Sequence, residues 1–159
     1  MLCSILIILS WTGCTADEEV VPVFEEEVGE ALYFERIGLG HTALFTERTE
    51  RVVRTPEAWA VAQDSLIELG PFKDVDFEQT MVLFAAVPVE TGGYSIQFET
   101  IELVNDEIIA TYMLTEPDED CIPTTTLTQA MPFQAVLVRR ADAPVRFVQE
   151  TELFTCELE

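Results

Sequence analysis

The sequence predicts an α+β domain in which one helix packs on an antiparallel β-sheet of about five to six strands. Two observations lead to this fold class. Apolar residues recur at helical spacing in one segment, residues 56–69, whereas the segments after residue 80 have the continuous or alternating apolar pattern of strands. A chain of 159 residues is also long enough for one domain with its own core.

The helix is predicted from its start and stop signals. Residues 42–53 before it mix β-branched residues with alternating charges, as in an extended segment with one exposed face. Thr55 is a favoured N-cap, Pro56 suits the first turn, and Gly70 and Pro71 end a helix at about Leu69. The apolar residues of this helix share one face and are Trp59, Ala62, Leu66 and Leu69.

The strands begin with Met81 to Val87, a continuous apolar run typical of a buried central strand. In the next strand Tyr94, Ile96 and Phe98 share one face, while Ile101 and Leu103 follow the opposite parity. Because side chains alternate along a strand, this phase change predicts a β-bulge or sharp bend near Thr100.

The later segments complete the sheet. Asn105 and Asp106 form turn material before a strand that begins at Glu107, and residues 116–120 read as a polar loop. Residues 134–140 and 145–154 read as two last strands around an AlaAspAlaPro turn.

The N-terminus resembles the export signal of a bacterial lipoprotein. Residues 1–13 are an uncharged apolar run, shorter than the about 20 residues that span a membrane, and small residues precede Cys14. We expect Cys14 to be lipidated and the protein to lie in the bacterial cell envelope, in the periplasm or at the surface. Residues 14–32 then form an acidic flexible tether, and residues 33–159 form the folded domain.

The charge balance limits the possible partners. Eight basic against thirty acidic residues give a net charge of -22. This excludes general electrostatic attraction to nucleic acid or to anionic lipid headgroups, so membrane contact would come through the lipid anchor. The acidity favours solubility, and binding of a basic partner or of divalent cations is a second possible use of this charge.

Two cysteines remain for the folded domain once Cys3 and Cys14 are assigned to the leader and the lipidation site. In an oxidising exported compartment Cys121 and Cys156 are most simply a disulfide, which would close a loop of about 35 residues. Two separate free thiols are the alternative, because the sequence does not show that their Cα atoms come within reach.

The segment Thr91, Gly92, Gly93 and Tyr94 is the most distinctive local feature. A glycine pair between strands has an ordinary explanation as a hairpin turn. A binding role is the other interpretation, since uncovered backbone N–H groups and the flat face of Tyr94 suit an extended strand or a carboxylate of a partner.

The order of several short motifs resembles the PrcB C-terminal domain family, bacterial exported proteins named after a lipoprotein subunit of a cell-surface protease complex. The resemblance runs from about Thr42 to Phe147. Its motifs are Trp59-Ala60, Asp76-Phe77, residues 91–96 (ThrGlyGlyTyrSerIle), Pro117 and residues 127–132 (LeuThrGlnAlaMetPro). It implies a non-catalytic domain that binds or stabilises a partner protein, for which an exported protease is a candidate.

Residues for other chemistry are scarce, so we expect no enzyme, no cofactor and no metal. A hydrolase of the Ser-His-Asp type would have to use His41, the sole histidine, and the sequence has no Gly-x-Ser-x-Gly turn to accompany it. We expect the segment GlyLeuGlyHisThr to be a loop with an exposed His41. The count of histidines and cysteines excludes common zinc sites. The alternative function is a small-ligand or calcium-binding envelope lipoprotein that uses the acidic residues Glu116, Asp118, Glu119 and Asp120, although their spacing is not that of an EF-hand.

Overall fold

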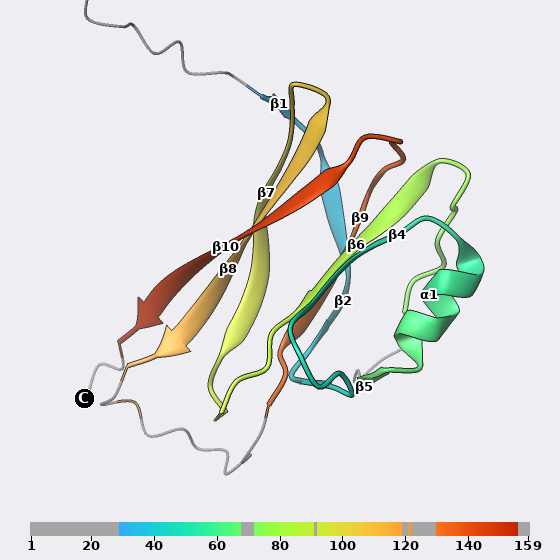
Figure 1. The fold of residues 1–159 in the computed structure, drawn as a ribbon. Coiled ribbons are helices and arrows are strands. Elements are labelled where there is room, and N and C mark those ends of the chain that lie inside the picture. Colours follow the sequence, from blue (N-terminus) through green and yellow to red (C-terminus); the bar gives the residue numbers. More distant parts are fainter. Residues whose placement is uncertain (1–28, 68–71, 91, 119–120, 122–129, 156–159) are drawn as a thin grey trace, which may run out of the picture.

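Strands dominate the fold, which is built in three layers (Figure 1). The computed structural model describes residues 29–67, 72–90, 92–118, 121 and 130–155. Within these residues two four-stranded sheets pack face to face, and one helix with a two-stranded sheet covers the far side of the second. We call the layers the outer sheet, the central sheet and the helix layer.

The outer sheet has the strand order β1-β7-β8-β10 and the central sheet the order β2-β9-β6-β4. The outer strands are β1 (Glu30–Ala31), β7 (Ser95–Val104), β8 (Glu107–Pro117) and β10 (Val145–Phe154). The central strands are β2 (Phe34–Gly40), β9 (Phe133–Arg139), β6 (Thr80–Ala86) and β4 (Thr49–Val53). The helix layer holds α1 (Pro56–Gln63) and the pair β3 (Thr42–Ala43) and β5 (Leu66–Ile67).

The predicted α+β class, with one helix on one antiparallel sheet, is therefore wrong, and the fold is mostly β. The cause lies in the central sheet, whose strands β6 and β9 bury side chains on both faces. A helix of eight residues covers part of one such face. The opposite face needs a second sheet, because apolar surface on both sides of a strand must be removed from water.

β6 confirms the prediction of a buried central strand. Its residues Met81 to Ala86 are fully buried, and β9 and β4 flank it. Met81, Leu83 and Ala85 face the core between the two sheets, and the intervening Val82, Phe84 and Ala86 face the core under the helix layer. Alternation along one strand thus serves two cores.

The hairpin of β7 and β8 confirms two further predictions. The register shifts between Phe98 and Thr100, which is the bulge expected from the change of parity. Asn105 and Asp106 have φ angles of 49° and 61°, the left-handed conformation of a two-residue hairpin turn.

A hydrogen bond across the core joins the two sheets: the Phe98 N–H donates to Oε1 of the buried Gln134 on β9 at 2.6 Å.

β10 departs from the predicted antiparallel arrangement. It follows β9 of the central sheet but pairs in parallel with β8 of the outer sheet. The AlaAspAlaPro segment carries the chain between the layers, and Arg54 holds it by donating to the carbonyl oxygens of Ala141 and Ala143 at 3.3 and 3.0 Å. A parallel pair needs such a crossover, whereas a hairpin would have kept β10 beside β9.

The helix ends earlier than predicted. It starts as expected, since the Thr55 side chain accepts a hydrogen bond from the Ala58 N–H at 3.2 Å. It stops at Gln63, because Leu66 and Ile67 pair with β3 as a strand. Trp59 and Ala62 are buried as predicted, Leu66 is buried from β5, and Leu69 lies outside the described residues.

Two findings concern the N-terminal part of the chain. Glu30 and Ala31, which the sequence assigns to the acidic tether, pair with β7 as strand β1. Residues 1–28, including Cys14 and the predicted leader, lie outside the described residues.

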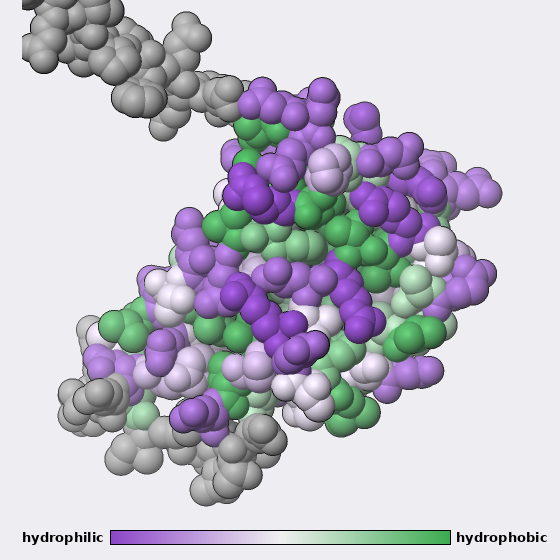
Figure 2. Space-filling model, in the orientation of Figure 1, coloured by the Kyte–Doolittle hydropathy of each residue, from purple (hydrophilic) through white to green (hydrophobic). Residues whose placement is uncertain are grey.

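Hydrophilic residues and apolar patches are interspersed over the face of the molecule shown in Figure 2.

Candidate functional site

The glycine segment at residues 91–94 lies in the connection between β6 and β7. These strands belong to different sheets, so the connection passes from the central sheet to the outer sheet and is not a hairpin turn. The hairpin explanation of Gly92 and Gly93 is therefore wrong. Thr91 lies outside the described residues.

The base of this connection is tied to residues near β9. The Val87 N–H donates to the Pro132 carbonyl at 3.1 Å, and Val89 and Ala130 exchange backbone bonds of 2.9 and 3.3 Å. The end of the segment 127–132, of which residues 127–129 are not described, is thus held against Val87 and Val89, just before the glycine segment. This adjacency is a tertiary contact.

The two glycines differ in their surroundings. Gly92 is buried, whereas Gly93 is exposed and has a φ of 98°. L-residues rarely adopt this left-handed region, so glycine is required at position 93 to turn the chain into β7. The turn presents the Gly93 backbone to solvent directly before Tyr94.

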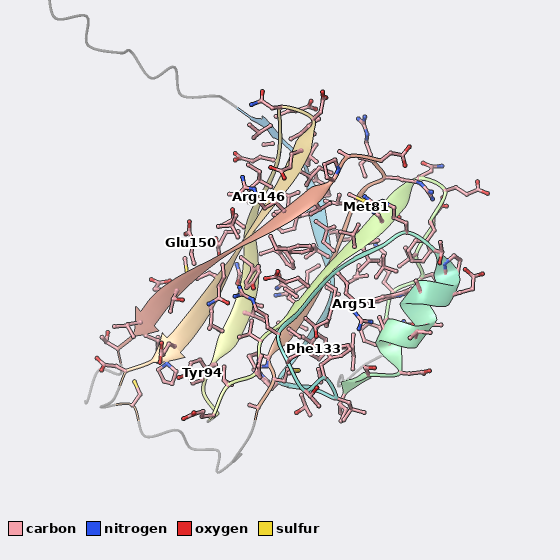
Figure 3. All side chains as sticks on the ribbon, in the orientation of Figure 1. Arg51, Met81, Tyr94, Phe133, Arg146 and Glu150 are labelled. Atoms are coloured by element: carbon pink, nitrogen blue, oxygen red, sulfur yellow. The ribbon has the colours of Figure 1, made fainter. Side chains whose placement is uncertain are left out.

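Tyr94 is half-buried and packs against the core between the two sheets. Its hydroxyl donates a hydrogen bond of 2.8 Å to Oε1 of Glu116 at the end of β8. Figure 3 places Tyr94 at this end of the outer sheet, beside the end of β8. The contact fixes the ring in one orientation and holds a carboxylate next to the exposed turn.

The hydrogen bond to Glu116 raises the pKa of Tyr94 above its ordinary value. Partial burial acts in the same direction, as does the negative charge of Glu116 and of Glu90. Tyr94 is therefore a neutral hydrogen-bond donor at physiological pH, and the negative charge at this end stays on the carboxylates.

The neighbouring edge of the outer sheet adds apolar surface to the site. Glu116 stands opposite Leu153 of β10, and the exposed fractions of Leu153 and Phe154 are 63% and 56%. The Phe154 carbonyl accepts a hydrogen bond of 2.9 Å from the Asp118 N–H. We call this surface the Tyr94 end of the molecule; it comprises Gly92, Gly93, Tyr94, Glu116, Leu153 and Phe154.

Cys121 lies beneath this end. It is buried and disulfide-bonded, and its sulfur is 3.3 Å from the carbonyl oxygen of Phe154, two residues before Cys156. Cys156 lies outside the described residues, so its pairing with Cys121 stays a prediction.

The Tyr94 end combines three kinds of surface. It offers hydrogen bonds, negative charge and apolar side chains on a turn held by a sheet. Among the described residues no group of three or more His, Cys, Asp or Glu side chains is placed to hold a metal ion. Glu119 and Asp120 of the predicted calcium alternative lie outside those residues.

His41 is exposed, as predicted, although Gly38 to Gly40 before it belong to β2 and not to a loop. It lines a surface pocket of about 280 Å³ together with Leu39 and Ile67, and its carbonyl accepts from the Met131 N–H at 3.0 Å. The absence of a catalytic role stays a prediction.

A polar cluster that the sequence did not reveal lies at the opening between β4 and β10. The side chain of Tyr112 is fully buried, and its hydroxyl donates to Oε1 of Glu50 at 2.5 Å and accepts from Arg48 at 2.5 Å. Oε1 of Gln149 lies 3.4 Å from the same hydroxyl oxygen. Residues from both sheets meet here. Tyr112 is more than sixty positions away from Arg48 and Glu50 in the sequence, so no local sequence pattern predicts these contacts.

The membrane anchor remains a prediction based on the leader. No helix in the part of the chain that the structure describes is both long and apolar enough to cross a membrane. Cys14 and the leader before it are outside that part.

Comparison with known proteins bears on this same region. Residues 80–135 match the family model described as PrcB C-terminal, which confirms the resemblance inferred from the sequence. The match contains Gly92 to Tyr94 and Glu116 and is shorter than the predicted span, since Trp59 and Asp76-Phe77 precede it. No curated protein and no solved structure matches the chain.

Proposed function

We propose that this protein is a non-catalytic, lipid-anchored envelope protein that binds a partner protein through its Tyr94 end, with an exported protease complex as the first candidate partner. The observation that carries the proposal is the match of residues 80–135 to the PrcB C-terminal family model, because the matched segment contains most of the Tyr94 end. The resemblance associates this family with a subunit of a protease complex.

The geometry of the Tyr94 end supports binding. Gly93 exposes backbone at a turn, Tyr94 supplies a ring of fixed orientation, and Glu116 supplies a carboxylate. Tyrosine is enriched at protein interfaces because it combines apolar area with a polar tip and loses little conformational entropy. The net charge of -22 favours a partner whose contact surface is basic.

The lipid anchor supports the envelope location. An apolar leader of thirteen residues precedes Cys14, and an acidic tether separates that cysteine from the first described strand, β1. Two or more acyl chains on Cys14 would hold the domain near the membrane without any contact from the domain itself. Intact-mass analysis of membrane fractions tests this part: the expected product begins at Cys14 and carries acyl mass, and a Cys14→Ser variant loses both. A cytosolic, unacylated chain with residues 1–14 retained would contradict it.

The partner is tested by cross-linking in native membranes followed by affinity purification and mass spectrometry. Tyr94→Ala should reduce recovery of the partner about tenfold if Tyr94 is an anchor of the interface. The matched control is Tyr33→Ala, because Tyr33 is 86% exposed and lies in the connection between β1 and β2, outside the Tyr94 end. Equal recovery with both variants would contradict the assignment of the site.

The carboxylate is tested separately with Glu116→Gln, which keeps the size and the hydrogen-bonding ability of the side chain. We expect weaker recovery of the partner at low ionic strength and a smaller difference at high ionic strength, since salt screens the lost attraction. Thermal denaturation of each variant checks that the fold is retained. Recovery that is unchanged at low salt would remove Glu116 from the interface.

A further inference from the structure

β10 is the last strand of the outer sheet and is unusually open. It spans ten residues and pairs with β8 on one side, and in the described part of the chain no strand pairs with its other side. Every one of its side chains is at least partly exposed. In Figure 1 its arrowhead end stands outermost in the sheet. A long strand edge of this kind is a template for pairing with another chain.

The hydrogen bonds to β8 identify which backbone groups of β10 are free. At one end the Pro144 carbonyl accepts from the Ile108 N–H, and at the other the Phe154 carbonyl accepts from the Asp118 N–H, both at 2.9 Å. In a parallel pair every second residue of a strand directs both its N–H and its C=O group to the same neighbouring strand. Pro144 and Phe154 both bond toward β8, so the backbone groups of the even-numbered residues of β10 face β8. The free edge is therefore formed by Val145, Phe147, Gln149, Thr151 and Leu153.

The charges of β10 are arranged so that the strand complements itself. Arg146 lies at its start and Glu152 near its end, and their equal parity puts both on one face of the sheet. A second β10 running in the opposite direction and centred on Gln149 would set each Arg146 opposite a Glu152. Centring on Glu150 instead would set two carboxylates against each other, which is unfavourable.

Arg146 has hydrogen-bonding capacity for such a contact. Its Nε donates to Oε2 of Glu107 at 3.1 Å, and this pair is exposed, with 52% and 39% of the two side chains accessible. Arginine has five N–H donors, so its terminal nitrogens can reach a second carboxylate. Figure 3 labels Arg146 and Glu150 at different positions along the strand.

We propose that two copies of this chain pair through β10 in an antiparallel manner about a two-fold axis at Gln149. The two outer sheets then form one continuous sheet. Free odd-numbered residues meet free odd-numbered residues in this register, so their N–H and C=O groups satisfy one another. Val145 of one copy lies beside Leu153 of the other and covers a side chain that is 63% exposed in the single chain. A two-fold contact of this type is closed, so pairing stops at the dimer.

The net charge sets the condition under which the dimer forms. Each copy carries -22, so long-range repulsion opposes association and is screened by salt, whereas the backbone bonds and apolar contacts along β10 are less affected. Dimerisation should therefore strengthen as ionic strength rises. This inference does not depend on the identity of a partner or on the Tyr94 end.

The charge pairing is tested by sedimentation velocity of the full chain in detergent. Arg146→Glu or Glu152→Arg alone should weaken dimerisation about tenfold, because the two-fold axis makes each change act twice. The double variant, which exchanges the two charges, should restore the wild-type affinity. A full chain that stays monomeric at high salt and high concentration would overturn the proposal, as would a double variant that behaves no better than the single ones.

The register is tested by cysteine cross-linking in membranes. Gln149→Cys places the two new cysteines opposite each other across the two-fold axis, so mild oxidation should yield a covalent dimer. Thr111→Cys is the control, because Thr111 is partly exposed on the outer sheet but lies on β8, which pairs there with β7 on one side and with β10 on the other. Equal dimer yield from the two variants would contradict pairing at β10.

Discussion

Tyr112 joins the two sheets at a single hydroxyl group. Its ring lies in the core between the sheets, edge-on to Phe98 at a centroid distance of 5.8 Å. Its oxygen meets Arg48 and Glu50, which belong to the central-sheet side of the opening. Burial raises the pKa of Tyr112 to about 12, with the hydrogen bond to Glu50 acting in the same direction and Arg48 acting against it.

This shift makes stability depend on pH in the alkaline range. The unfolded pKa of tyrosine is about 10, so between about pH 10 and 12 the unfolded chain loses a proton that the folded chain keeps, and stability falls as pH rises. Below pH 10 the contribution is fully present. Urea unfolding of wild type against Tyr112→Phe should therefore show a steeper alkaline loss in wild type.

Tyr33→Phe is the control for this measurement, because Tyr33 is exposed. At neutral pH Tyr112→Phe should itself cost about 1–2 kcal/mol, since Glu50 and Arg48 lose their common partner. Parallel pH profiles for wild type and Tyr112→Phe would contradict the assignment.

The stability of the short helix α1 depends on the residue that caps its start. The helix has eight residues and buries Trp59 and Ala62 against the central sheet, where the Trp59 ring meets Phe72 edge-on at 5.3 Å. An isolated helix of this length is unstable in water. Its stability therefore comes from this packing and from the cap at Thr55.

Removing the cap should loosen the helix layer by a predictable amount. Thr55→Ala deletes the hydroxyl that accepts from the Ala58 N–H, and the expected loss is about 1 kcal/mol in the free energy of unfolding. Thr55→Ser keeps the hydroxyl and should stay close to wild type. Urea midpoints measure both variants, and equal midpoints for Ala and Ser would show that the cap contributes nothing.

At the scale of the whole molecule, charge repulsion acts on a fold held by two apolar cores. Thirty acidic residues face eight basic ones. The three ion pairs between described residues are largely exposed: Arg48–Glu50, Lys73–Glu35 and Arg146–Glu107. Exposed pairs of this kind contribute little to stability, so the excess of negative charge dominates the electrostatics.

Salt should accordingly stabilise the protein. Raising ionic strength from about 0.01 M to about 1 M shortens the screening length from roughly 30 Å to roughly 3 Å, which removes the repulsion between distant carboxylates. We expect the urea midpoint to rise with sodium chloride at pH 7. A midpoint that falls with salt would mean that attractive pairs outweigh the repulsion. Measuring at a protein concentration where sedimentation finds monomer separates this effect from dimerisation.

Local patterns predicted those features whose cause is local. The apolar run of β6, the change of parity at the β7 bulge and the turn at Asn105 and Asp106 are each encoded within a few residues. The segment Gly92 to Tyr94 is distinctive for the same reason, and the family match contains it.

The errors concern relations between distant segments. The sequence predicts one antiparallel sheet, whereas β6 and β7 lie in different sheets and β10 crosses over to run parallel to β8. The contact of Tyr94 with Glu116 is likewise not encoded locally, because it depends on the register between β7 and β8. The spacing of Leu66 predicts a helical position, but its pairing with β3 makes it part of a strand.

The sequence by itself determined the buried strand β6, the change of parity in β7, the start of the helix and the acidity, and the lipidation of Cys14 stays a prediction. Only the tertiary structure decided the number of layers, the partner of β10 and the surroundings of Tyr94. The physical reason is that the alternation of apolar and polar side chains indicates which face of a segment is buried. It does not indicate which neighbour covers that face, because an apolar face can pack against more than one kind of neighbour. The choice among neighbours follows from the crossover connections and from long-range hydrogen bonds such as that of Gln134 with Phe98, which no local window contains.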